Sequence, residues 1–217
     1  MKRYFLLILA TVLLAGCKNS KPLLPNVSGK AGEILVVTEK AEWEGEPGNE
    51  IRELLAAECP FLAQREPLYT LVNVPTGGFA DMLKVHRNIV YFAVGSPCEA
   101  PGGTYLHDVW ASPQCVIRIS AETPEKAAEL VRDNGKMILS AIEQAERDRV
   151  IRNCIKYEEK SLAAIVGERF GGSPHFPIGY KLRKISSDFA WIADVKQYTN
   201  QAVLIYRYPV LSDDNFS

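Results

Sequence analysis

The cysteine at the end of the apolar N-terminal run is the residue whose chemical role is best indicated by the residues around it. Cys17 follows two small residues at the end of the run Tyr4–Ala15, and Lys2 and Arg3 precede that run. Such a thiol could belong to a membrane helix, to a disulfide or metal site, or to a modification site. The run is 12 residues long, whereas a membrane-spanning helix needs about 20 apolar residues. A cleavable secretory signal is therefore favoured over a membrane span.

The residues Leu14-Ala15-Gly16-Cys17 resemble the bacterial lipobox. In proteins with this motif the cysteine sulfur takes a diacylglyceryl group, the preceding peptide bond is cut, and the new amino terminus is acylated. The resemblance implies cleavage between Gly16 and Cys17, and a mature chain held in the membrane by acyl chains such as palmitate. Each buried methylene contributes about 0.8 kcal/mol, so two or more chains anchor stably.

The residues after the cysteine bear on the destination of the mature chain. Lys18, in place of Asp, resembles lipoproteins that enteric bacteria send on to the outer membrane. Signals for surface export have an acidic run after the cysteine, and no such run follows Cys17. We therefore expect the chain in the cell envelope, at the periplasmic face of the outer membrane rather than at the cell surface.

The net charge of the mature chain argues against a nucleic-acid partner, and its length allows a substantial core. Without residues 1–16 the chain has 23 basic and 26 acidic residues, a net charge of -3. Nucleic-acid-binding proteins usually carry a basic surface, so no nucleic acid partner is expected. We expect a signal peptide in residues 1–16, a lipidated tether in 17–31, and a domain of unknown function in 32–217, which is long enough for a substantial core.

Four further cysteines form an even set in what would be an oxidising compartment. They are Cys59, Cys98, Cys115 and Cys154. Two disulfides are compatible with this set, and Cys98 with Cys115 is the first pair to test because the two bracket a loop. Four small buried hydrophobic residues are the interpretation we favour. The spacing has no CxxC and no histidine at zinc-ligand distance, so no metal site is predicted.

The three histidines are the candidates for a catalytic base. His107-Asp108 could form an oriented base, with Ser112 or Ser173 as a nucleophile. The sequence contains no G-x-S-x-G, HExxH or EF-hand pattern that would support a nucleophile or a metal. We favour ordinary hydrogen-bonded histidines for His86, His107 and His175. No catalytic residue and no cofactor is predicted.

Three other features are candidates for binding. The loop Arg169–Tyr180 ("RFGGSPHFPIGY") combines Gly, Pro, His and aromatic residues, and Arg169, His175 and Tyr180 could form the rim of a ligand or protein site. In "NVPTGGFADM" (residues 73–82) a strand leads into Gly-Gly, whose amides could hold an anion, although a plain turn is favoured. The tryptophans and two tyrosines could line a carbohydrate or peptide groove, although core or edge positions are more common for such residues; they are Trp43, Trp110, Trp191, Tyr206 and Tyr208.

The elements that would position these residues follow from the hydrophobic pattern. Short apolar runs predict strands at residues 33–38, 68–74, 88–94 and 114–120, the last forming a hairpin or bent strand with residues 108–112. Residues 96–103 are predicted as a loop. A helix is predicted around Ile51–Leu55, and Thr123-Pro124-Glu125 predicts the start of a long amphipathic helix that extends to Ile155 with Gly135 as its weak point. A further helix around residues 158–170 is stopped by Gly171.

The C-terminal part has a different pattern. Three runs with strand alternation, "IGYKLRKIS", "DFAWIADV" and "QAVLIYRYP", predict an antiparallel meander. The fold class predicted for the whole is α+β, with a mixed or antiparallel sheet packed against a long helix and a C-terminal antiparallel meander.

The stretches "GKAGEILVVTEKAEWEG", "NVPTGGFADMLKVHRNIVYF" and "AVLIYRYP" resemble a family of uncharacterised lipoproteins of Bacteroidota, known as a domain of unknown function. The resemblance covers most of the chain from Pro25 and implies an envelope lipoprotein without implying a reaction. Members of that family continue past the point where this chain stops, so a truncation after Ser217 is expected, which would expose a strand edge.

The sequence thus predicts a lipid-anchored protein with a binding or structural role. Its expected partners are the membrane, through acylated Cys17, and an unidentified envelope protein or glycan. The alternative is a membrane-tethered hydrolase of a cell-envelope glycan or peptide, with His107 or His175 as base.

Overall fold

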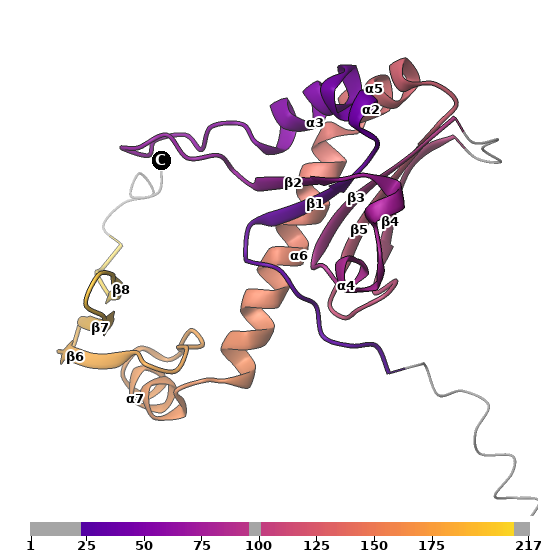
Figure 1. Cartoon of the computed structure of the whole chain (residues 1–217). Coiled ribbons are helices and arrows are strands. Elements are labelled where there is room, and N and C mark those ends of the chain that lie inside the picture. Colours follow the sequence, from indigo (N-terminus) through magenta and orange to yellow (C-terminus); the bar gives the residue numbers. More distant parts are fainter. Residues whose placement is uncertain (1–22, 96–100, 211–217) are drawn as a thin grey trace, which may run out of the picture. The chain divides into compact units, whose positions relative to one another are not determined.

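The computed structural model describes residues 23–95 and 101–210 (Figure 1). The chain forms two compact units, Met1–Ile142 and Glu143–Ser217, here called the first and the second unit. The division falls within the helix α6 (Gly135–Lys156). Each unit has its own sheet, so the α+β class predicted from the sequence is confirmed.

The first unit is built on a five-stranded mixed sheet with the strand order β2-β1-β3-β5-β4. Four of its strands run parallel, and β4 is antiparallel to β5. The strands are β1 (Glu33–Val37), β2 (Thr70–Val74), β3 (Asn88–Val94), β4 (Gly102–His107) and β5 (Cys115–Ala121). The runs of β1, β3 and β5 are apolar without alternation because parallel strands are buried on both faces.

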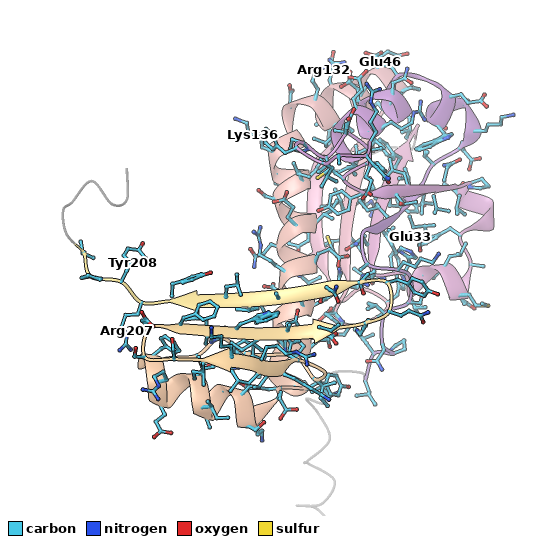
Figure 2. The ribbon with its side chains drawn as sticks, turned by 90° about the vertical axis from the view of Figure 1, so that its left-hand side faces the viewer. Glu33, Glu46, Arg132, Lys136, Arg207 and Tyr208 are labelled. Atoms are coloured by element: carbon cyan, nitrogen blue, oxygen red, sulfur yellow. The ribbon has the colours of Figure 1, made fainter. Side chains whose placement is uncertain are left out.

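Helices pack on one face of this sheet. They are α2 (Lys40–Glu44), α3 (Glu46–Leu55), α5 (Pro124–Asp133) and the beginning of α6. Their buried side chains include Ile51, Val131 and Ile138. Helices α3 and α5 pack side by side, and Arg132 of α5 links them, with its Nη2 3.0 Å from Glu46 Oε1 (Figure 2).

The other face of the sheet is only partly covered. Short elements lie on it, the 3-10 turn η1 (Thr76–Gly78) and the helix α4 (Asp81–Lys84), together with the loop before β5. Their side chains pack on a cluster formed by Leu35, Val37, Ile89 and Val116. Val72 stays 39% exposed and Leu106 37% exposed. The apolar cavity described below lies on this partly open face of the first unit.

The helix start predicted at Thr123 is confirmed. The Thr123 hydroxyl accepts a hydrogen bond from the Lys126 backbone N–H at 3.3 Å, as an N-cap does. The expectation of one continuous helix up to Ile155 was wrong, because α5 ends at Asp133 and α6 begins at Gly135. The Asn134 side chain donates to the Leu130 carbonyl at 2.8 Å, which satisfies an acceptor at the end of α5.

The strand β4 was missed because Gly102 and Gly103 made its beginning resemble a loop. The partner of β5 in the hairpin is Gly102–His107, and the expectation of a strand over residues 108–112 was wrong. Asp108, at a φ of 52°, begins the turn that occupies those residues. Residues 96–100 of the predicted loop lie outside the described residues.

The second unit contains the meander predicted from the sequence. The antiparallel strands β6 (Lys181–Ile185), β7 (Phe189–Val195) and β8 (Asn200–Tyr206) form a layer over α7 (Lys160–Phe170) (Figure 2). Their shared core consists of Leu162, Val166, Phe176, Ala190 and Ile192. Gly171 ends α7 in the left-handed conformation, at a φ of 80°.

The cysteines differ in burial. Cys115 is fully buried, and Cys59 and Cys154 are partly buried. Among the described residues these three form no disulfide with one another. Cys98 lies outside the described residues, so its pairing with Cys115 stays a prediction. No helix formed by the described residues is both long enough and apolar enough for a membrane span.

Candidate functional site

A cation on the open face of the first sheet marks the candidate site. Strand β5 is buried at every position except Arg118, which is exposed. Arg118 lies beside Tyr91, its register partner on β3. Within residues 23–95 and 101–210 no acidic side chain forms an ion pair with Arg118. The guanidinium is therefore available to an anion from outside the chain.

An apolar cavity of about 450 Å³ lies at one side of Arg118. Its aromatic residues contact one another: the Phe79 ring centroid is 5.5 Å from that of Trp110 and 5.8 Å from that of Tyr91. The lining residues are Phe79, Lys84, Tyr91, Leu106, Val109, Trp110, Val116 and Arg118. An apolar cavity with cationic groups suits a ligand that joins an apolar body to an anion.

A polar cavity of about 300 Å³ adjoins the first one, because Tyr91 and Arg118 line both. Its other lining residues are Thr38, Glu39, Glu42, Thr76, Phe92, Ala93 and Val94. These residues follow or end β1, β2 and β3. The chain passes from β1 to β2 on one side and then to β3 on the other side of β1, so this cavity lies at the topological switch point of the sheet.

The two carboxylates of the polar cavity differ in their hydrogen bonds. Glu39 Oε1 accepts from the Thr76 backbone N–H at 3.1 Å and from the Thr76 hydroxyl. Glu42 Oε2 is buried and has no hydrogen-bond partner among the described residues. Buried polar atoms are usually satisfied. Glu42 can therefore accept a hydrogen bond from a donor that occupies the cavity.

Gln114 holds the walls of the apolar cavity in place. It is 2% exposed. Its Nε2 donates to the Lys84 and His86 carbonyls at 2.6 and 2.8 Å, and its Oε1 accepts from the Trp110 backbone N–H at 2.9 Å. Two wall residues on separate segments, Lys84 and Trp110, are thus fixed by one amide.

The structure gives His86 a structural position. The ring is 6% exposed, with Nε2 2.9 Å from Glu33 Oε1 and Nδ1 3.0 Å from the Asn88 carbonyl oxygen. The hydrogen bond with His86 is the largest cause that holds the pKa of Glu33 below its ordinary value. His86 does not line either cavity.

The residues considered as a base and nucleophile have other partners. His107 Nδ1 is 3.1 Å from the Tyr105 hydroxyl. Asp108 accepts from the Ser112 hydroxyl at 3.1 Å and from the Gln114 backbone N–H at 2.8 Å. These contacts stabilise the turn before β5. Ser173 donates to the adjacent Pro174 carbonyl at 2.9 Å.

The three candidates in the loop of the second unit each contact a different group. His175 Nδ1 is 2.9 Å from Glu158 Oε1, and the Tyr180 hydroxyl donates to Gln201 Oε1 at 3.0 Å. The Arg169 carbonyl accepts from Arg207 Nη2 at 3.0 Å. No hydrogen bond or ion pair between the described atoms of Arg169, His175 and Tyr180 joins them into one site. Phe176, 1% exposed, anchors this loop in the core.

Of the residues that line the two cavities, Arg118 has a recognisable signal in the sequence and Glu42 has none. Arg118 is the charged residue inside the apolar run "QCVIRIS", and a lone cation within a buried strand is the signal that could have identified it. Glu42 has no such signal. Of the tryptophan candidates, Trp110 lines the apolar cavity. Trp43 packs instead under Arg52, whose Cζ is 4.5 Å from the Trp43 ring centroid. Among the described residues, no group of three His, Cys, Asp or Glu side chains is placed to hold a metal.

Comparisons with known proteins give two matches. Residues 27–155 match the model of a family described as a domain of unknown function (DUF8532). This range includes every residue that lines the two cavities. Residues 1–17 match the prokaryotic membrane lipoprotein lipid attachment site, which fits a lipid-anchored protein. No curated protein and no solved structure matches the chain.

Proposed function

The chain belongs to this family of domains of unknown function, and we propose that it is a lipid-anchored, non-catalytic binding protein at the periplasmic face of the outer membrane. Its ligand is an envelope component that joins an anionic group to an apolar body. The observation that carries the proposal is Arg118, an exposed cation without an acidic partner among the described residues, between aromatic walls.

The anchor is Cys17. Cleavage between Gly16 and Cys17 makes the cysteine the new amino terminus, and its acyl chains insert into the membrane. Lys18 supports the outer membrane as the destination. The match of residues 1–17 to a lipid attachment site supports the anchor itself.

The ligand class follows from the residues that line the cavities. A guanidinium binds carboxylate and phosphate groups through paired hydrogen bonds. The rings of Phe79, Tyr91 and Trp110 would cover the apolar body of the ligand. A hydroxyl or ammonium group on the same ligand would donate to Glu42 Oε2 in the adjoining cavity.

The lining favours binding over the alternative of a tethered serine or cysteine hydrolase of peptides. No histidine, cysteine or serine is among the residues that line either cavity. A peptide hydrolase of the serine or cysteine kind pairs its nucleophile with a histidine base, and the residues that line the two cavities offer no such pair. His107 and His175 contact Tyr105 and Glu158 instead.

Metabolic labelling tests the anchor. Cells that express the chain are grown with an alkyne analogue of palmitate, and the labelled protein is captured. We expect label in the unsubstituted chain and none in Cys17→Ala. Equal labelling of the two would overturn the anchor while leaving the ligand site untouched.

A pair of small probes tests the ligand site. 3-Phenylpropionate and 3-phenylpropanol share an apolar body and differ in charge. We expect the chain to bind the anion roughly tenfold more tightly than the alcohol, and Arg118→Gln to remove this preference. Arg65→Gln, at an exposed position of the same unit, is the matched control and should keep it. Equal affinity of the unsubstituted chain for the two probes would refute the site.

A further inference from the structure

The second sheet has an apolar face that no helix formed by the described residues of its own unit covers. Along β7 and β8 the side chains alternate, so that Ile192, Val203 and Ile205 pack in the core with α7. The opposite side chains point outward, and this side is here called the outer face. Its exposed fractions are 42% for Trp191, 50% for Leu204 and 62% for Tyr206. Phe189 joins them, with its ring centroid 5.0 Å from that of Tyr206.

The charges on this face have one sign. Lys181 and Lys184 of β6 are the register partners of Ala193 and Trp191, so they border the apolar residues. Arg183, between them, is exposed as well. None of these three cations forms an ion pair with a described residue.

Acidic side chains do not occupy the outward positions of the neighbouring strands. The positions of β7 and β8 on the same side as Trp191 are Phe189, Trp191, Ala193, Val195, Asn200, Ala202, Leu204 and Tyr206. Of these, Ala193 is buried and Phe189 half-buried, and the others are exposed. Asp194 points to the opposite side, and its Oδ2 is 2.9 Å from Lys196 Nζ. The outer face is therefore apolar and aromatic in the middle and basic along β6.

We propose that the outer face of the second unit binds the surface of an anionic lipid bilayer. Tryptophan and tyrosine favour the level of the lipid headgroups, because their rings are apolar with one polar atom. Lysine and arginine keep their stems along apolar surface and extend their charge to the headgroup phosphates. A second copy of the chain fits less well, because each copy would bring unpaired cations and no acid to the contact.

This contact goes beyond the proposed function and does not require acylation of Cys17. Trp191 and Lys184 lie in the second unit, whereas the ligand site lies in the first. An acyl anchor would strengthen the contact by raising the local concentration of lipid around the sheet. The test therefore uses residues 18–217, which contain every described residue and lack the anchor.

Co-sedimentation with vesicles tests the proposal. We expect this chain to bind vesicles of phosphatidylcholine with phosphatidylglycerol, and to bind vesicles of phosphatidylcholine alone much more weakly. Lys181→Gln, Arg183→Gln and Lys184→Gln together should lower the partition coefficient on the anionic vesicles at least about tenfold at low salt. Trp191→Ser should lower it several-fold on the same vesicles.

A matched control changes the same number of charges elsewhere. Lys40→Gln, Arg65→Gln and Lys136→Gln alter exposed cations of the first unit and should leave vesicle binding within twofold. Equal losses in the two triple variants, or equal binding to both kinds of vesicle, would overturn the proposal. So would self-association of the unsubstituted chain in sedimentation velocity that Trp191→Ser abolishes, because a second copy would then cover the face.

Discussion

Tyr91 and Arg118 occupy paired positions on the adjacent parallel strands β3 and β5, and both side chains line the apolar and the polar cavity. Two residues 27 positions apart in the chain thus connect the two cavities. The pairing gives the cavities an aromatic ring next to a guanidinium, which is a combination suited to anions with an apolar body.

Substitution of Gln114 should loosen the apolar cavity and the fold together. In Gln114→Glu the donor to the Lys84 and His86 carbonyls is lost, and a carboxylate oxygen faces them instead. We expect the free energy of unfolding to fall by about 1–3 kcal/mol and the affinity for 3-phenylpropionate to fall as well. Urea unfolding and calorimetric titration measure the two effects. The exposed Gln197→Glu is the control, and an equally small effect at both positions would contradict the role of Gln114.

Gly29 should tolerate no side chain. It has a φ of 92°, and a Cβ atom there would lie 2.4 Å from His86 Nε2. Gly32 has a φ of 73° and no atom within 4 Å of such a Cβ. Both Gly→Ala changes place a Cβ atom at positive φ, which costs about 1–2 kcal/mol, and Gly29→Ala should cost clearly more because it also displaces His86. Equal losses of unfolding free energy in the two variants would show that the contact with His86 is unimportant.

The stability of the first unit should depend on the ionisation of Glu33. Its pKa is lowered in the folded state from the ordinary 4.5, mainly by the hydrogen bond with His86. A lowered pKa means that the contribution to stability is present above pH 4.5 and is lost as the pH falls through the folded-state value. The difference in unfolding free energy between the unsubstituted chain and Glu33→Gln should be constant at neutral pH and should decrease below pH 4.5. Urea unfolding over a pH series measures it, and a difference that persists unchanged in acid would refute the assignment.

The N-cap at Thr123 should contribute measurably to α5. Thr123→Ala removes the acceptor of the Lys126 backbone N–H, and we expect a loss of about 1 kcal/mol in unfolding free energy. Thr123→Ser keeps a hydroxyl at the same position and should lose less than half as much. Thermal unfolding of the two variants separates the cap from other effects of the residue. A Thr123→Ser variant as unstable as Thr123→Ala would contradict the cap.

Local patterns predicted most elements but not the sheet that arranges them. The apolar runs of β1, β3 and β5, the cap of α5 and the meander at the end were predicted because each depends on neighbouring residues. The strand β4 was missed because its stability comes from pairing with β5, which outweighs the weak strand preference of Gly102 and Gly103. The break between α5 and α6 at Asn134 was predicted only as a weak point of one helix, at Gly135.

By itself the sequence determined the lipid attachment site around Cys17, the α+β class and the positions of most strands and helices, because short-range order and periodicity encode these features. The tertiary structure alone decided which side chains share a surface. It brought Glu42, Tyr91 and Arg118 around adjoining cavities and gave His107 and Asp108 separate partners. Strand order and register set such proximity, and they result from pairing between segments that are distant in the chain.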